Sequence, residues 1–210
     1  MKIYSILSYC AVFSILLPLS IAVIRFKDLQ REMKILALLL SFGAMTELAA
    51  NLLANNKINN LPILHLYSVV EFSLLFTIYY LFFQGLISRS VYRLGIVGFF
   101  MLALINVLLF QGLQTFNTYP LLVECTVFTG LSLLFFYQTL KEKKVLHIEQ
   151  SAMFWFSSGH LIYFAGNLSI FTFSNFILEI SNQLHEGIWA IHSVFLIILY
   201  ITYSISLLCR

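Results

Sequence analysis

Long apolar runs separated by short polar connections dominate the chain. A helix needs about 20 mostly apolar residues to cross the hydrocarbon core of a bilayer. Seven segments meet this requirement: residues 3–24, 35–54, 63–83, 94–111, 121–140, 151–173 and 188–208. The pattern therefore predicts an all-α, polytopic membrane bundle of seven transmembrane helices, with residues 1–210 forming a single domain.

Prolines mark where some of these segments begin or bend. Pro62 and Pro120 stand at the start of the third and fifth segments, where the missing N–H of proline costs little. Pro18 lies inside the first segment, so we expect a kink there. No small-residue cleavage site precedes Arg25, and we expect the first segment to be retained as a helix.

Composition supports a surface that faces lipid. The 210 residues are 60% hydrophobic and 10% charged, with a mean hydropathy of +0.93, whereas soluble domains carry about 25% charged residues. The lipid bilayer is therefore the first partner that we expect. No run of like charges is long enough for a nucleic-acid-binding arm, so nucleic acid is excluded as a partner. Cys10, Cys125 and Cys209 are expected to be packing residues without a disulfide.

Lysine and arginine fall mainly on alternate connections. One set of connections holds only Lys2 and Lys57. The other set holds ten: Arg25, Lys27, Arg31, Lys34, Arg89, Arg93, Lys141, Lys143, Lys144 and Arg210. Basic loops stay on the cytoplasmic side. This predicts an N-terminus outside, a C-terminus in the cytoplasm, and basic inner loops that could address a cytoplasmic protein partner. We expect a multi-pass integral protein of a bacterial inner (cytoplasmic) membrane.

The ionisable residues within the spans lie toward the outer side. With a rise of about 1.5 Å per residue and the orientation above, all of them fall in the outer half of the membrane or at its middle. They are Glu47, Glu71, Glu124, His65, His160 and His192. Such residues are costly in a bilayer, so they are candidates for function.

Helical spacing groups these residues with polar neighbours. Glu47 and Asn51 are four residues apart, as are Tyr67 and Glu71, so each pair shares a helix face. Polar stripes of this kind should face the bundle interior, which predicts a polar cavity open to the outside. The candidate ligand-binding residues are Glu47, Asn51, His65, Tyr67, Glu71, Glu124, His160, Tyr163, Asn167 and His192.

The charge of this cavity indicates the kind of ligand. No lysine or arginine lies within the seven spans, so the glutamates have no permanent cationic partner. They favour a proton, a metal ion or an amine-bearing small ligand from outside over an anion. The metal-ligand candidates are His65, Glu71, His160 and His192. No catalytic residue or cofactor is assigned, and bridging between helices is the alternative role for each residue.

Three functions fit these features. A receptor-like or sensory module matches the one-sided cavity and the absence of any soluble domain. A metal-dependent intramembrane hydrolase is an alternative; His185 and His192 loosely resemble, at a different spacing, the paired histidines of the seven-helix ceramidases and adiponectin-receptor hydrolases. A proton-coupled small-molecule transporter is the third, although the inner half has few polar groups. A retinal protein is excluded, because the last span has no lysine to form a Schiff base.

Two short segments carry a further resemblance. One is LPILHLY at residues 61–67, continuing to Glu71 and Phe72, and the other is IWAIHS at residues 188–193. In these segments the chain resembles an uncharacterised group of bacterial seven-helix membrane proteins. The resemblance implies the seven-helix fold and a bacterial membrane, but no established activity.

Overall fold

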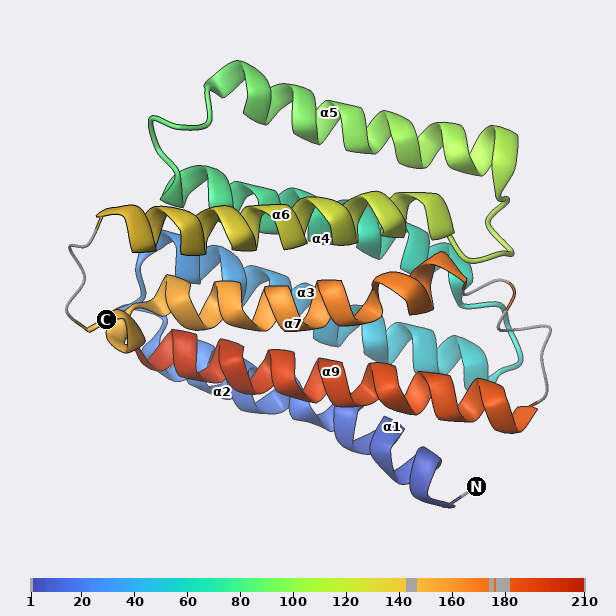
Figure 1. The fold of residues 1–210 in the computed structure, drawn as a ribbon. Helices are drawn as coiled ribbons and strands as arrows, with labels where there is room; N and C mark the ends of the chain where they lie inside the picture. Colours follow the sequence, from blue (N-terminus) through green and yellow to red (C-terminus); the bar gives the residue numbers. More distant parts are fainter. Residues whose placement is uncertain (1, 143–146, 174–175, 177–181, 210) are drawn as a thin grey trace.

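The computed structural model describes residues 2–142, 147–173, 176 and 182–209, and the described chain is almost entirely helical (Figure 1). No strand is present in these ranges, so the all-α expectation is confirmed. The helices are α1 (Lys2–Ser14), α2 (Leu16–Arg25), α3 (Arg31–Asn55), α4 (Leu61–Phe82), α5 (Arg89–Ile105), η1 (Asn106–Phe110), α6 (Thr118–Glu142), η2 (Ile148–Gln150), α7 (Ala152–Thr172) and α9 (Asn182–Leu208).

Six helical segments in the described residues are long and apolar enough to cross a membrane. They are Ile6–Arg25, Arg31–Asn55, Leu61–Phe82, Arg89–Phe110, Thr118–Lys141 and Glu186–Leu208. The remaining expected span, residues 151–173, corresponds to α7, which has 21 residues but is not among the six. Its Ser157, His160 and Asn167 make it less apolar, and all three are buried.

The first apolar segment is interrupted where Pro18 predicts. Helix α1 ends at Ser14 and α2 begins at Leu16. Proline has no N–H to donate, so Pro18 cannot bond to the carbonyl four residues earlier, which is that of Ser14. The helix is thus interrupted within the turn before Pro18, where the sequence predicts a kink.

The fourth segment ends in an irregular turn. Helix α5 passes at Ile105 into the π-helical η1, in which one extra residue is accommodated per turn. The side chain of Asn106, at this junction, is buried with 1% of its surface exposed. Its two amide atoms have no hydrogen-bond partner within the described ranges. The apolar periodicity of residues 94–111 gives no sign of this turn.

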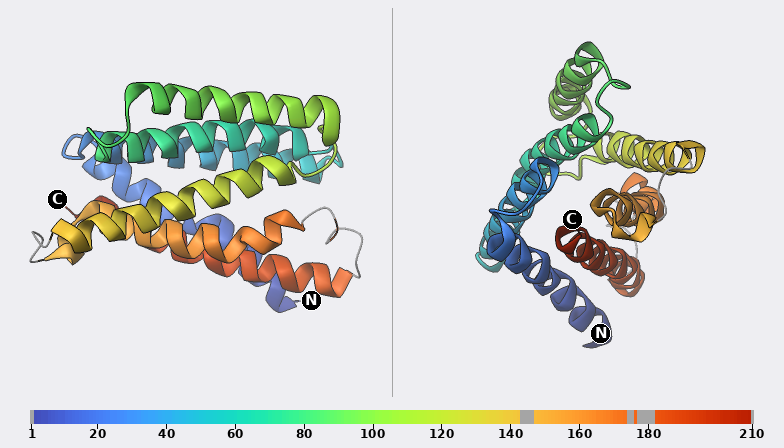
Figure 2. Two further views of the ribbon diagram at one scale, coloured as in Figure 1. Left: turned by 45° about the horizontal axis from the view of Figure 1, so that its top comes forward. Right: turned by 90° about the vertical axis from the view of Figure 1, so that its left-hand side faces the viewer.

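The long helices form two facing rows. Viewed along the bundle, α1 to α5 make a curved row, and α6, α7 and α9 lie opposite it (Figure 2). Helix α7 packs between α6 and α9; α1 and α2 pack on α9 at one edge, and α4 and α5 contact α6 at the other. The buried side chains, and the cavities described below, lie between the rows.

The outer surface is apolar over much of its area. Ile24 is 82% exposed, Leu140 77% and Leu109 72%. In water such a surface would be an aggregation hazard, whereas lipid tails solvate it without cost. The exposed side chains therefore agree with the six apolar spans.

Helices α7 and α9 approach each other closely at two glycines of α7. A Cβ atom on Gly159 would overlap the side chain of Thr202, and one on Gly166 would lie 2.6 Å from the ring of Phe195. Small residues at helix contacts let the backbones approach in this way in membrane bundles. The α7–α9 pair is thus the tightest element of the row that carries α6, α7 and α9.

We expect Gly159→Ala to destabilise the protein. Alanine is normally favoured over glycine inside a helix by about 1 kcal/mol, but here the added methyl group overpacks the contact with Thr202, which costs about 1–3 kcal/mol. Thermal unfolding in detergent should show a lower midpoint. The control is Gly130→Ala in α6, where a Cβ meets no atom within 4 Å. An unchanged midpoint for Gly159→Ala would contradict the close packing.

Candidate functional site

Two adjacent cavities lie between the rows of helices. The first chamber, of about 160 Å³, is bounded by α1, α3, α4, α7 and α9. The second chamber, also of about 160 Å³, is bounded by α4, α6, α7, α9 and the connection before α6. The two chambers share the side chains that separate them: Leu64, Tyr67, Glu71, Tyr163 and His192.

Two acidic side chains reach the first chamber from α3 and α4. The Tyr67 hydroxyl donates to Glu71 Oε1 over 3.1 Å, one helical turn away. The amide of Asn51 donates to Glu47 Oε1 over 2.9 Å. Glu47 is half-buried and lines the chamber, whereas Asn51 is exposed and does not. Both pairs predicted from the four-residue spacing are therefore formed, and each carboxyl group has one donor.

The second chamber contains a buried carboxyl group without a partner. Glu124, in the second turn of α6, is 1% exposed, and neither of its oxygens has a hydrogen-bond partner among the described residues. Glu71 lines the same chamber. Nearby, the Asn117 amide donates to Ser68 Oγ over 2.8 Å, so those two polar groups satisfy each other. A buried carboxyl group left unpaired is costly, which makes Glu124 the most informative residue of the site.

His192 stands between the chambers in a defined orientation. Its Nδ1 lies 2.9 Å from Asn167 Oδ1. Since that oxygen can only accept, Nδ1 carries the proton, and Nε2 is the accepting nitrogen of the neutral ring. Asn167 is itself fixed, because its amide donates to the carbonyl of Tyr163 over 2.8 Å. Asn167 is thus a positioning residue for His192 and lines neither chamber.

The walls of both chambers are acidic and aromatic. Among the described residues, three glutamates and one histidine line them, and no lysine or arginine does. Aromatic walls in the second chamber include Phe116 and Trp189, stacked with ring centroids 5.5 Å apart. The negative faces of aromatic rings favour cations. The arrangement therefore suits a small organic cation rather than an anion.

His160 belongs to a separate hydrogen-bonded chain. Its Nε2 lies 2.6 Å from the Tyr203 hydroxyl and its Nδ1 3.2 Å from the Tyr79 hydroxyl. The Ser132 hydroxyl uses its proton to donate to the Phe128 carbonyl. Its oxygen lies 2.8 Å from the Tyr79 hydroxyl and therefore accepts a hydrogen bond from Tyr79. Tyr79 must then accept from Nδ1–H, and Tyr203 donates to Nε2. Every member of this chain is paired.

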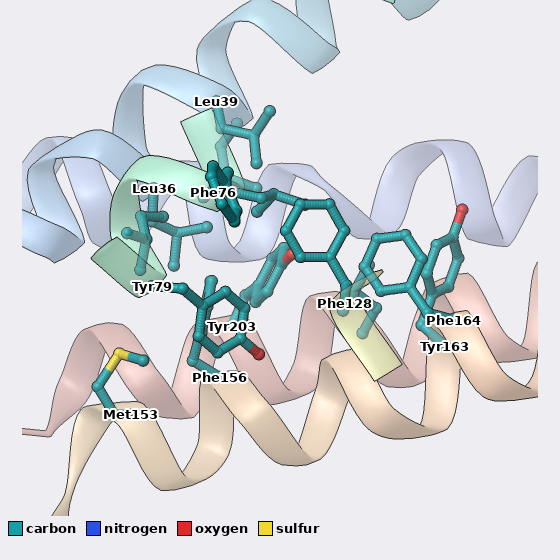
Figure 3. Close-up of a cluster of buried hydrophobic side chains, with 14 of the residues drawn as sticks. Leu36, Leu39, Phe76, Tyr79, Phe128, Met153, Phe156, Tyr163, Phe164 and Tyr203 are labelled. Atoms are coloured by element: carbon teal, nitrogen blue, oxygen red, sulfur yellow. The ribbon is translucent and has the colours of Figure 1, made fainter. Parts of the chain in front are cut away.

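The surroundings of this chain are closely packed aromatic rings. Figure 3 shows Tyr203 and Phe156 next to Tyr79, with Phe128 and Phe164 beyond them. The ring centroid of Phe156 lies 4.0 Å from that of His160, which has no exposed surface. His160 therefore links α4, α7 and α9 and lines neither chamber, although Tyr203 lines the first.

His65 also has a structural role. Its Nε2 donates to the Thr115 carbonyl over 2.8 Å, which ties α4 to the connection before α6. The four metal-ligand candidates are consequently not brought together. No group of three or more His, Cys, Asp or Glu side chains among the described residues could hold a metal ion. The side chain of His185, which the hydrolase alternative used, lies outside the described residues.

Sequence reasoning missed several residues of the site. Tyr200, Thr46 and Leu199 line the first chamber, and Trp189 and Cys125 line the second. A signal for Tyr200 was present in the sequence. It lies eight residues after His192, with Leu196 midway, so all three share one face of α9.

We expect His160→Phe to destabilise the protein and the addition of Tyr203→Phe to restore part of the loss. The single change leaves the buried Tyr203 hydroxyl without its acceptor, which costs about 1–3 kcal/mol, whereas removal of both members of a pair is nearly neutral. The Tyr79 hydroxyl loses the bond from His160 but still donates to Ser132. Chemical denaturation in detergent measures the difference. The converse result, with additive losses in the double variant, would show that the Tyr203–His160 bond contributes nothing.

Comparison with protein-family models, with described protein sequences and with solved structures finds no match to this chain.

Proposed function

We propose that the chain is a receptor-like module of a cytoplasmic membrane that binds a protonated amine from outside in its two chambers. In this proposal it has seven spans, with α7 as the sixth, an external N-terminus and a cytoplasmic C-terminus. The ligand changes the packing of the helices, and the basic inner connections address a cytoplasmic protein partner.

The distribution of basic residues supports this orientation. The α2–α3 and α4–α5 connections, the end of α6 and the start of α7 lie at the end of the bundle that holds the C-terminus, and the N-terminus lies at the other end (Figure 1). Among the nine lysines and arginines of the described residues, seven lie at the end with the C-terminus: Arg25, Lys27, Arg31, Lys34, Arg89, Arg93 and Lys141. Basic connections remain in the cytoplasm, so the second chamber, which is lined by Phe116, Asn117 and Trp189 near the other end, lies toward the outside. The first chamber extends from there to the middle of the bundle, at Leu40 and Leu199.

The unpartnered carboxyl group of Glu124 carries the functional proposal. A protonated amine would supply both the hydrogen-bond donors and the positive charge that this group lacks. Glu71 would contribute a second acceptor to the same ligand, because it lines the same chamber. An anionic ligand would instead meet three glutamates with no lysine or arginine to offset them.

The residues below the chambers favour a receptor over a transporter or a hydrolase. Tyr203 forms part of the wall of the first chamber, and the bonded chain from Tyr203 through His160 and Tyr79 to Ser132 crosses the bundle beneath it. This layer is closely packed, and every member of the chain from Tyr203 to Ser132 is hydrogen-bonded, which opposes a route through the inner half. It also connects the wall of the first chamber to α4, α6 and α7. A receptor requires such a connection, because a bound ligand must change the packing of the helices.

Charge-selective labelling of Cys125 tests the proposed cavity. Cys125 lines the second chamber, and Cys10→Ser with Cys209→Ser leaves it as the sole thiol. From outside, we expect a trimethylammonium methanethiosulfonate to modify it at least about tenfold faster than a sulfonate methanethiosulfonate, because nearby carboxylates concentrate cations. Glu124→Gln should reduce this preference. A cysteine placed at the exposed Asn59, which lies outside both chambers, gives the control ratio of the two modification rates.

Protection of Cys125 distinguishes the kind of cation. We expect n-butylamine to slow modification more than tetramethylammonium at the same concentration, because only the first has N–H groups to donate to Glu124. Equal rates for both charged reagents would contradict the acidic chamber. Failure of both to react, with Cys125 reactive after denaturation, would contradict access from outside.

Labelling of connections in intact cells tests the orientation. In a cysteine-free background, we expect a cysteine at Asn59, between α3 and α4, to react with an impermeant maleimide. A cysteine at Leu86, which is 56% exposed between α4 and α5, should react only after permeabilisation. The reverse pattern would invert the topology, and reaction of both in intact cells would show that α4 does not cross the membrane.

A further inference from the structure

We infer that the ligand is a linear diamine, with one ammonium group held by Glu124 in the second chamber and the other by Glu47 in the first. This inference rests on the proposed amine-binding function and specifies the ligand of the same site. It follows from how the three carboxyl groups are distributed over the two chambers.

The carboxyl groups are spread along the site rather than gathered at one point. Glu47 lines only the first chamber, Glu124 lines only the second, and Glu71 lines both. A ligand with one ammonium group could engage Glu124 and Glu71, but would leave Glu47 unused. Two ammonium groups on one chain reach both ends of the site, with Glu71 between them.

The three carboxyl groups differ in how many hydrogen bonds they already accept. Glu71 and Glu47 each accept one bond, from Tyr67 and Asn51 respectively. Glu124 accepts none among the described residues. An ammonium group has three donors, so one end of a diamine would satisfy Glu124 and still reach Glu71. The other end would add its donors to the half-paired Glu47.

The size of the chambers restricts the ligand to a thin chain. A cavity of about 150 Å³ holds a molecule of the size of benzene, and each chamber has about 160 Å³. The two chambers adjoin at the side chains that line both, among which Leu64 offers an apolar surface for methylene groups. Bulky polyvalent cations would not fit this space.

The helix arrangement sets the length of the chain. Helix α4 packs against both α3, which carries Glu47, and α6, which carries Glu124. Packed helices have axes about 8–10 Å apart. Both glutamates line chambers that share Glu71, so we expect the two ammonium groups to be separated by a distance on the order of one helix spacing, about 10 Å, and the chain-length series below tests this distance. A short methylene chain spans this distance.

Calorimetric titration of the full chain in detergent tests the inference. The probes are putrescine, cadaverine, hexamethylenediamine and octamethylenediamine, with n-butylamine as the monoamine. We expect the best diamine to bind at least about tenfold more tightly than n-butylamine, which is the effect of one additional charge-assisted contact. Affinity should pass through an optimum along the series.

Two glutamate variants separate the ends of the ligand. Glu47→Gln should reduce the affinity of the best diamine to that of n-butylamine and leave n-butylamine unchanged. Glu124→Gln should weaken both probes. The matched control is Glu149→Gln, since Glu149 lies in η2 and lines neither chamber; it should change neither affinity.

The outcomes distinguish this inference from the proposed function. The diamine inference is wrong if n-butylamine binds as tightly as every diamine, or if Glu47→Gln leaves the preference for diamines intact. In either case the proposed binding of an amine is still supported. If no amine binds to protein that unfolds cooperatively on heating, the proposed function itself fails.

Discussion

A bundle with an apolar surface has to pair its polar side chains internally, and this requirement shapes the interior of the protein. Many hydroxyl groups meet it locally by donating to the carbonyl one turn earlier, as Ser20, Thr126 and Thr172 do. The larger polar groups need partners on other helices. His160 has two, on α4 and α9, and His192 has one on α7. Glu124, by contrast, is left unpaired among the described residues, at the wall of a cavity.

The helices could be predicted largely from apolar run length, because residues that cover a lipid-facing surface leave a strong pattern. The expected segment 63–83 corresponds to Leu61–Phe82, and 121–140 to the longer Thr118–Glu142. The interruption of the first helix near Pro18 follows from the missing backbone N–H of proline. The π turn that begins at Asn106 could not be predicted in this way, since the apolar run continues through it without a change of pattern. Polar residues in α7 lowered its apolar signal while its burial kept it inside the bundle.

The candidate site was predictable where partners share a helix. The Tyr67–Glu71 and Glu47–Asn51 bonds follow from a spacing of four residues, and both are present. His160 was assigned to the ligand site because the sequence gives its depth and face, but its partner Tyr79 is 81 residues away in the chain. Such a pairing depends on which helices become neighbours. The same holds for His65, which is used by the Thr115 carbonyl rather than by a ligand.

Helix α9 connects the chambers with the opposite end of the bundle. It contributes His192 and Tyr200 to the first chamber, together with Tyr203, which is bonded to His160. At its C-terminal end, Arg25 Nη1 donates to the carbonyls of Leu207 and Leu208 over 3.0 and 2.6 Å, so α9 is anchored to α2 beside the basic connection. Under the proposed function, a cation that draws Glu71 and its neighbours together changes the packing around α9 at one end. Because a helix moves as a stiff unit and the C-terminal end of α9 is bonded to Arg25, the change reaches the basic connection that follows α2.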